Sequence, residues 1–317
     1  MSEYKQIDLR KVKTISIGHR KSKVRPAQFA SIFDPRREPF SKFIQSFPHI
    51  LVAEDLRSFV DDVVQSVRRR KPVMVMLGAH VIKVGLGPLL IDLVDRKIIT
   101  SVSMNSAAAI HDVETAMWGK TSEDVEEHLL DGTFGMSRET GEFINGVLAR
   151  SAASDGGGYG EALGKALQKA PKRKFSLLAA CFRCKVPVTV HAAIGTDIIH
   201  QQPTMNGAVT GEMTFRDFKV LCNVVKDLQN GGVVMNIGSA VVLPEVFLKA
   251  LTVARNLGFG ARGFTAANFD MIQHYRARVN VVQRPTKKHG KGYLFTGHHE
   301  IMIPLVAAMI KDRLRAR

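Results

Sequence analysis

Short apolar runs alternate with segments of helical periodicity along most of this chain. The runs are bounded by turn residues, which is typical of buried strands. We expect strands over residues 71–77, 98–104, 186–193, 233–237, 264–267 and 293–296. Apolar positions three and four apart predict the helices between them, at residues 41–47, 55–70, 88–96, 121–130, 161–170, 215–228, 245–257 and 301–313.

This alternation predicts an α/β fold with a doubly wound, mostly parallel sheet and helices on both faces. Residues 1–40 are basic, interrupted by proline and weakly periodic, so we expect a basic N-terminal arm before a single domain over residues 41–317. Ligands of such sheets bind beyond the carboxyl ends of the strands. The small or polar segments that follow predicted strands should therefore share one crevice; they are residues 78–87, 105–112, 195–197, 238–240 and 265–270.

The net charge of +16 is concentrated at the two ends of the chain. Residues 1–40 hold ten Lys or Arg against four Asp or Glu, and residues 284–317 hold eight against two. Basic clusters can contact the phosphates of nucleic acid. These clusters lack interleaved aromatic residues, so we expect solvated tails and no nucleic-acid partner.

The other compositional signals predict a cytoplasmic protein without membrane or metal. No apolar run approaches the ~18 residues that span a bilayer, and the first residues carry no apolar signal region. An odd number of cysteines in this setting indicates reduced thiols. Cys181 and Cys184 form a lone Cys-x-x-Cys without the second pair that a zinc site needs, so they are expected in the core.

Several blocks of the sequence together resemble the deoxyhypusine synthase family, especially its bacterial-type branch. The similarity runs in collinear order over roughly residues 45–310. The blocks are residues 78–87 with 104–125, 188–197, 236–245 and 265–270. The resemblance implies a Rossmann-like fold and an NAD site shared between the subunits of a homotetramer or dimer. It also implies oxidation of a polyamine and transfer of the resulting butylimine through a lysine.

The resemblance assigns expected roles to individual positions. Positions that match the family's dinucleotide-binding segments are Asn105, Ser106, Ala107, Asp112, Gly238, Ser239, Ala240, Thr265 and Asp270. Asp197 matches an acidic position in the family's amine site, and His274 lies in its substrate loop. Glu245 stands near where the family has paired histidines, and we expect it, with Asp197, to bind an ammonium group of the substrate. His111 and His191, which follow predicted strands, are expected to be hydrogen-bonded loop residues.

The sequence departs from the family at the residue that forms the imine. The matching stretch, residues 279–286, contains no lysine, and Trp118-Gly-Lys120 lies in a different block. A lysine is required for that chemistry. We therefore expect an NAD-dependent transferase that acts on a polyamine or related amine and does not make deoxyhypusine.

Other residues could supply the reactive groups. Lys83, in the first glycine turn, could contact a phosphate, form an imine, or be an ordinary surface lysine. His298, His299 and Glu300 precede the last helix and could provide a general base for an unrelated substrate. A non-catalytic protein that binds NAD is a further alternative.

Overall fold

The computed structural model describes residues 3–154 and 156–315. By internal packing the chain divides into Met1–Glu54 and Asp55–Arg317. The first unit contains the 3₁₀ turns η1 (Leu9–Lys11), η2 (Ile17–His19) and η3 (Pro26–Gln28), and helix α1 (Phe40–Gln45). The rings of Phe33, Phe40 and Phe47 lie 5.3, 6.1 and 4.9 Å from that of Phe43. This aromatic cluster joins α1 to the basic segment that precedes it.

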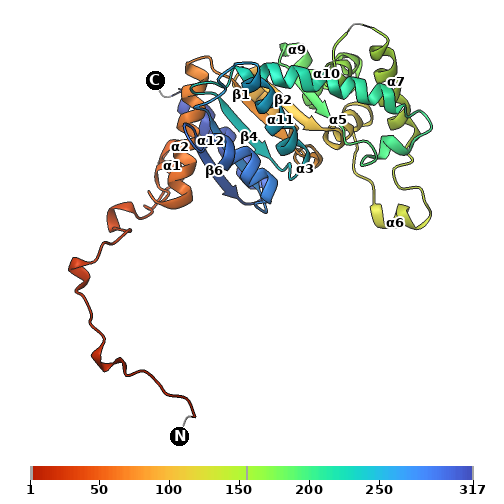
Figure 1. The fold of residues 1–317 in the computed structure, drawn as a ribbon. Coiled ribbons are helices and arrows are strands. Elements are labelled where there is room, and N and C mark those ends of the chain that lie inside the picture. The colour runs from red at the N-terminus through yellow and green to blue at the C-terminus, as the bar shows by residue number, and fades with distance from the viewer. Residues whose placement is uncertain (1–2, 155, 316–317) are drawn as a thin grey trace. The chain divides into compact units, whose positions relative to one another are not determined.

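In the second unit, six parallel strands of the described residues form one sheet in the order β3-β2-β1-β4-β5-β6 (Figure 1). The strands are β1 (Val73–Leu77), β2 (Ser101–Asn105), β3 (Val188–His191), β4 (Val233–Ile237), β5 (Thr265–Asp270) and β6 (Lys291–Thr296). This is the strand order of doubly wound dinucleotide-binding folds. The chain moves outward from β1 in both directions, so the topological switch point lies between β1 and β4.

Helices cover both faces of the sheet (Figure 1). They are α2 (Leu51–Arg68), α3 (Ala79–Lys83), α4 (Gly87–Asp95), α5 (Ser106–Trp118), α6 (Val125–Leu130), α7 (Arg138–Ala152), α8 (Tyr159–Ala166), α9 (Leu177–Cys184), α10 (Gly207–Lys226), α11 (Val242–Asn256), α12 (Arg284–Thr286) and α13 (His299–Arg315). Shorter turns are η4 (Leu167–Lys169), η5 (Arg173–Phe175) and η6 (Ile198–Gln201), and η7 (Ala277–Gln283) is a π-helix. No described helix is both long and apolar enough to cross a membrane.

The two faces of the sheet bury different side chains. All five residues of β1 are buried, as expected for a central strand covered on both sides. Met74 and Met76 pack in the cluster formed by α10, α11 and η7. On α2, the ring of Phe59 lies 5.5 Å from that of Phe269 on β5 and 5.6 Å from that of Phe295 on β6. The predicted α/β class, the parallel sheet and the helices on both faces are confirmed.

Several element boundaries were predicted wrongly. The structure begins α10 at Gly207, not at residue 215, because the side chain of Asn206 accepts a hydrogen bond from the Val209 N–H. Helix α6 begins at Val125, not at residue 121, because Asp124 caps it in place of Thr121 or Ser122. The segments read as glycine and small-residue turns contain α3 and α5. The helices α7 and α9 were not predicted.

Candidate functional site

Most of the predicted ligand-binding segments do gather at the carboxyl edge of the sheet. Gly78 follows β1 and Gly238 follows β4, so the two glycines face each other at the switch point. A Cβ atom on Gly78 would lie 1.9 Å from the carbonyl oxygen of Gly238. Gly238 also has a φ of +68°. Only glycines allow the two backbones to approach this closely.

Helix α5 begins directly at the end of β2. The side-chain oxygen of Asn105 accepts a hydrogen bond of 3.0 Å from the Ala108 N–H and so caps the helix. The hydroxyl of Ser106 donates to a carboxylate oxygen of Asp197, which follows β3. The first N–H groups of a helix have no intrahelical acceptor. Asn105, Ser106 and Ala107 therefore form a compact helix N-terminus that can hold an anionic group.

The turn after β4 is built in a similar way. Ser239 accepts a hydrogen bond of 3.2 Å from the Leu243 N–H in the first turn of α11. Its carbonyl accepts a hydrogen bond of 2.9 Å from the Asn236 side chain. Gly238, Ser239 and Ala240 thus place a second helix N-terminus at the same edge.

Two residues of the β5 segment lie at opposite ends of the strand. Asp270 is at the carboxyl end, is buried, and accepts a hydrogen bond of 2.8 Å from the Met271 N–H. Thr265 is at the amino end, where its hydroxyl donates to Asp62 over 3.2 Å. A six-residue strand separates its ends by roughly 16 Å. The expectation that Thr265 lies in the carboxyl-edge crevice is therefore wrong.

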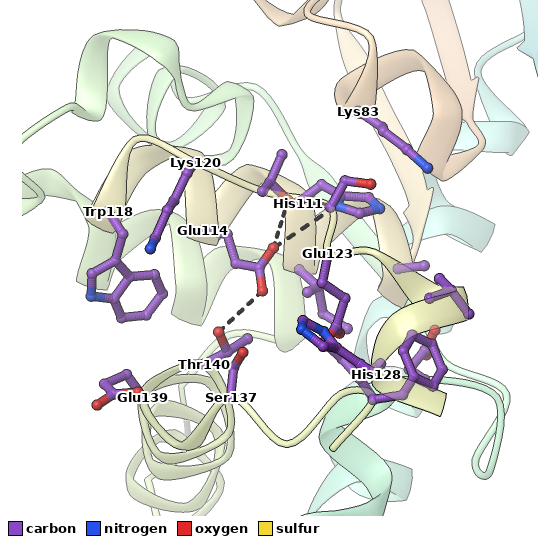
Figure 2. Close-up of a pocket in the computed structure, with 18 of the residues that line it drawn as sticks. Lys83, His111, Glu114, Trp118, Lys120, Glu123, His128, Ser137, Glu139 and Thr140 are labelled. Carbon is purple, nitrogen blue, oxygen red and sulfur yellow. Dashed lines mark hydrogen bonds and ion pairs between the residues drawn. The ribbon is translucent and has the colours of Figure 1, made fainter. Parts of the chain in front are cut away.

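A pocket of about 840 Å³ opens beside the carboxyl ends of β1, β2 and β3. Lys83 of α3 and one face of α5 form one side, and the connection between α5 and α7 forms another (Figure 2). Thr196, Asp197 and Ile198 complete the lining. Of the predicted site residues, the structure brings Lys83, Ala107 and Asp197 together in this pocket.

The lining of this pocket is acidic, although the chain carries a net charge of +16. Its carboxylates are those of Glu114, Glu123, Glu139 and Asp197. The only lysines in the lining are Lys83 and Lys120, and its two histidines are His111 and His128. Four carboxylates against two ammonium groups favour a cationic ligand.

A continuous hydrogen-bonded chain lies on the α5 wall of the pocket (Figure 2). The Thr121 hydroxyl donates to Glu114 over 2.5 Å, and its oxygen lies 2.6 Å from His111 Nδ1. Because the hydroxyl proton points to Glu114, the Thr121 oxygen accepts a hydrogen bond from the Nδ1–H group of His111. This leaves the Nε2 atom of a neutral His111 as a hydrogen-bond acceptor. Burial, and then the charge of Lys83, lower the pKa of His111 and favour this neutral form.

The segment between α5 and α7 is held in place by side chains that point inward. Glu123 accepts a hydrogen bond of 3.0 Å from the Gly135 N–H and lies 3.1 Å from Nδ1 of His128. The Thr140 hydroxyl donates to Glu114 over 3.1 Å. Glu114 therefore receives hydrogen bonds from both ends of this segment, which makes it the central carboxylate of the pocket.

Asp197 is the most buried carboxylate in the pocket lining. Its side chain is 6% exposed and lies 3.9 Å from Nδ1 of His200. Burial raises the pKa of Asp197 and lowers that of His200. The buried hydroxyl of Tyr159, which has no hydrogen-bond partner among the described residues, is close enough for Asp197 to raise its pKa further. Asp197 is thus a carboxylate that a cationic ligand would stabilise in its charged form.

Asp112 is placed away from the pocket lining, inside the core. It accepts hydrogen bonds from the Ser176 hydroxyl at 2.5 Å and from the Leu177 N–H at 2.7 Å. A third bond, of 3.3 Å, comes from the Leu178 N–H. Burial raises its pKa to about 6. These contacts make Asp112 the anionic cap of α9; its NAD-binding role stays a prediction.

The three adjacent residues before α13 do not form one cluster. The structure exposes His298 and Glu300, whereas His299 is buried and its Nε2 atom lies 3.1 Å from the Phe269 carbonyl. The His299 ring lies 5.8 Å from that of His80, at the switch point. A shared general-base site at these three residues finds no support in this arrangement.

The remaining predicted substrate residues also lie outside the pocket lining. Glu245, at the start of α11, is bound by Lys249, by Arg276 at 3.3 Å and by Asn280 at 2.8 Å. These partners lower its pKa, the Lys249 contact most of all. His274 is exposed after β5. Glu245 and His274 therefore do not share the pocket with Asp197.

Sequence reasoning missed the α5 side of the pocket. His111 was expected to be a hydrogen-bonded loop residue, and Glu114 was not singled out. Both lie on α5, three residues apart on one face, a spacing that was readable once the helix was known. Trp118 and Lys120 were set aside by position, but they also line the pocket.

The structure offers no evident metal site in the ranges it describes. No group of three His, Cys, Asp or Glu side chains there could hold a metal ion. Cys181 is buried, and the Cys184 thiol lies 3.1 Å from Asp95. The three cysteines are free thiols, and Cys181 is in the core as expected. Cys184 is only half-buried, so the expectation that it packs in the core is wrong.

Comparison with known proteins gives structural matches only. No protein-family model matches the sequence, and a search of curated proteins finds no match. Among solved structures, AgrE in ternary complex with ornithine and NAD⁺ is 11% identical, with a TM-score of 0.54 over 83% of this chain and 33% of AgrE. ArgZ, an arginine dihydrolase of the cyanobacterial ornithine-ammonia cycle, is 17% identical, with a TM-score of 0.50 over 83% of this chain and 32% of ArgZ.

A third match has the length of this chain. A candidate deoxyhypusine synthase from Entamoeba histolytica is 8% identical, with a TM-score of 0.51 over 87% of this chain and 95% of that protein. The chain spans about a third of the length of AgrE and ArgZ. At these identities the matches establish a Rossmann-like α/β fold, which this chain shares with deoxyhypusine synthase-like proteins.

Proposed function

We propose that this protein is an NAD-dependent enzyme that oxidises a small amine carrying more than one positive charge. The observation that carries the proposal is the acidic pocket at the carboxyl edge of the sheet. The largely covered carboxylates of Glu114, on α5, and Asp197, after β3, both line it, so two ammonium groups of one ligand could be bound at once. The sequence resemblance and the solved complex of AgrE with ornithine and NAD⁺ support the same substrate and cofactor classes.

The residues at the switch point fit a dinucleotide. The turn Gly238–Ala240 and residues Asn105–Ala107 carry small side chains without carboxylates, and each turn leads into the N-terminus of a helix of thirteen or more residues. Such N-termini suit a pyrophosphate. When bound there, NAD⁺ supplies a hydride acceptor next to the amine pocket.

His111 is our candidate for the general base. An ammonium group must lose a proton before its lone pair can drive the loss of hydride from the neighbouring carbon. The Nε2 atom of His111 can take that proton, and Thr121 and Glu114 stabilise the resulting imidazolium through Nδ1. The substrate then loses two electrons and one hydrogen as hydride and becomes an iminium ion. General-base catalysis of this kind contributes ~10²- to 10⁴-fold in rate.

Transfer of the oxidised group requires a lysine, and two candidates reach the pocket. Attack by a neutral lysine amine on the iminium carbon would form an imine and release the original amine. Lys83 stands near His111, and Lys120 lies beside Trp118 (Figure 2). Borohydride reduction during turnover, followed by peptide mass spectrometry, tests this step. An adduct on Lys83 or Lys120 makes the protein a transferase; turnover without an adduct makes it a dehydrogenase.

Exposed apolar side chains at the carboxyl edge support a shared-site assembly. Val241 follows β4, Ile272 and Tyr275 follow β5, and Ile301 begins α13; they are 49%, 64%, 59% and 69% exposed. A second copy of the chain could cover them by two-fold symmetry. The proposal therefore includes a homodimer or homotetramer with the nucleotide site near the subunit contact.

Calorimetric titration tests the binding site directly. We expect NAD⁺ to bind, and we expect diamines, polyamines and basic amino acids to include a ligand that binds the NAD⁺ complex. Glu114→Gln and Asp197→Asn should each lower the affinity for that amine by about 10- to 100-fold, because each removes a charge-assisted contact. Glu126→Gln, which changes an exposed carboxylate on α6, is the matched control. If NAD⁺ binds but none of these amines binds the complex, only the alternative of a non-catalytic NAD-binding protein would be left.

A further inference from the structure

The amino edge of the sheet is strongly basic, in contrast to the pocket edge. Four loops lead into the central and outer strands there: residues 69–72 before β1, 226–232 before β4, 255–263 before β5 and 287–290 before β6. They hold eight Lys or Arg residues against one carboxylate, that of Asp227. The cations are Arg69, Arg70, Lys71, Lys226, Arg255, Arg262, Lys287 and Lys288. We call this set of loops the basic edge.

These loops are adjacent in space because the strands that they precede are paired. The Asn230 N–H donates to the Arg262 carbonyl over 2.8 Å, and the Lys71 ammonium donates to the Gln229 carbonyl over 3.0 Å. The Lys291 N–H, just after the last loop, donates to the Phe264 carbonyl over 3.2 Å. The cations of four separate loops therefore form one continuous surface.

The charges of the basic edge are largely uncompensated. Within the described ranges, none of its cations forms a salt bridge, although Arg255 donates to the Ala261 carbonyl over 2.9 Å. Arg96, Arg183 and Lys291, at the same edge, are paired with Asp92, Asp95 and Asp62. Clustered like charges repel one another, so binding of an anionic partner would reduce the electrostatic repulsion at this surface.

A cleft of about 610 Å³ opens within the basic edge and contains an aromatic ring. Three cations, Arg70, Lys71 and Lys226, line it against one carboxylate, that of Asp227. Phe259, which is 45% exposed, is also part of the lining. The Lys226 ammonium lies 5.4 Å from the centre of the Phe259 ring. Cations beside an exposed aromatic ring are the combination with which proteins bind single-stranded nucleic acid: phosphates contact the cations and a base stacks on the ring.

We infer that the basic edge binds single-stranded nucleic acid, such as RNA, independently of the proposed amine site. The cations at the two ends of the chain are not interleaved with aromatic residues, so the sequence indicated no such site there. The fold supplies one by bringing Phe259 to Arg70 and Lys226, which are far apart in the sequence. The site is also at the opposite end of the strands from the nucleotide crevice, so RNA and NAD⁺ would not compete.

Fluorescence anisotropy with a labelled twelve-nucleotide oligouridine tests this inference. The wild-type protein should bind with an affinity that falls as salt rises, by roughly 0.7 log units per tenfold increase in salt for each phosphate contacted. The double variant Arg70→Gln/Lys226→Gln should bind about tenfold more weakly. Because it loses two phosphate contacts, its plot of log affinity against log salt concentration should be less steep by roughly 1.4. Phe259→Leu should weaken binding about 5- to 150-fold, whereas Phe259→Trp should retain it.

Matched variants separate this surface from general attraction to a basic protein. Arg138→Gln/Arg150→Gln, on α7, removes the same charge and should change the affinity less than twofold. Lys11→Gln/Lys13→Gln tests the basic N-terminal segment. The inference is overturned if oligouridine does not bind, if either control pair weakens binding as much as the test pair, or if Phe259→Leu has no effect. Preferential binding to duplex DNA or to phosphatidylserine vesicles would also overturn it.

Discussion

At the scale of single residues, the candidate site depends on contacts that hydrophobic patterns do not reveal. Thr121 reaches His111 and Glu114 because α5 ends at Trp118 and is followed by Gly119, which has a φ of +74° and turns the chain back. The sequence identified Lys83, Ala107 and Asp197 as site residues, but His111 could not be recognised before α5 was known. The position of one glycine thus decides which side chains face the pocket.

The hydrogen-bonded chain gives His111 a predictable titration. Its pKa lies below its usual value because of burial and the Lys83 charge. We therefore expect the pKa of His111 to rise in Lys83→Met, with burial keeping it below that of an exposed histidine. NMR titration of the ring nitrogens checks this, and Lys120→Met is a control at the same pocket. An unchanged His111 pKa in Lys83→Met would contradict the placement of Lys83.

The buried carboxylate of Asp217 should make stability depend on pH. It accepts hydrogen bonds from the Gly160 and Val190 N–H groups at 2.8 and 2.6 Å, and burial raises its pKa to about 8. The ordinary pKa of an aspartate is 3.8, so the folded protein binds this proton more tightly than the unfolded chain does. Protonated Asp217 therefore stabilises the fold fully below about pH 4, and this stabilisation is lost as pH rises through 8. The melting temperature of Asp217→Asn should therefore change less between pH 5 and 8 than that of the wild-type protein. If its profile parallels that of wild type and of the exposed control Asp227→Asn, Asp217 does not titrate in this range.

At the scale of elements, β1 to β5 were predictable because each is a short run that is buried along nearly all of its length. The edge strand β6 is largely exposed, and only its last four residues were predicted. The helices α3 and α5 were not, because strand ends rich in Gly, Ser and Ala also suit ligand-binding turns. Asn105 resolves the ambiguity by capping α5 immediately after β2. Helix α7 carries mixed polar and apolar residues whose periodicity was not singled out. Helix α9 is a short and almost wholly apolar segment, so it shows no polar face from which a helix could be predicted.

The contact between β1 and β4 gives a prediction for the switch point. A Cβ atom on Gly78 would collide with the Gly238 carbonyl, and backbone cannot move aside as a flexible side chain can. We expect Gly78→Ala to lower the free energy of unfolding by roughly 3 kcal/mol, at the upper end of overpacking effects. Urea denaturation measures this.

Gly211→Ala is the control for that substitution. Gly211 lies inside α10 with no atom near the added Cβ, so alanine should raise stability by ~0.5–1 kcal/mol. Equal effects of the two substitutions would mean that the β1–β4 contact is looser than described.

At the scale of the whole molecule, the sequence predicted a parallel sheet but not its strand order. The order places acidic side chains beyond the carboxyl ends of β1, β2 and β3, and unpaired cations before the amino ends of β1, β4, β5 and β6. A net charge of +16 therefore hides two surfaces of opposite character. Long-range strand pairing determines both, and no local pattern contains it.

The exposed apolar edge gives a prediction for assembly. We expect a homodimer or homotetramer in light scattering, and Ile272→Glu/Ile301→Glu should shift it toward the monomer by placing charges in an apolar contact. NAD⁺ binding should weaken in parallel, because the proposed site lies near that contact. Leu129→Glu/Leu130→Glu, on exposed α6, serves as the control. A monomeric wild-type protein that binds NAD⁺ tightly would contradict the shared site.

The most direct test of the central claim is NADH production. Purified protein is mixed with NAD⁺ and a panel of diamines, polyamines and basic amino acids, and NADH fluorescence is followed over time. We predict that at least one amine gives turnover with wild-type protein, and that His111→Gln lowers the rate by roughly 10²- to 10⁴-fold while NAD⁺ binding is retained. Absence of NADH with every amine, or full activity in His111→Gln, would contradict the account.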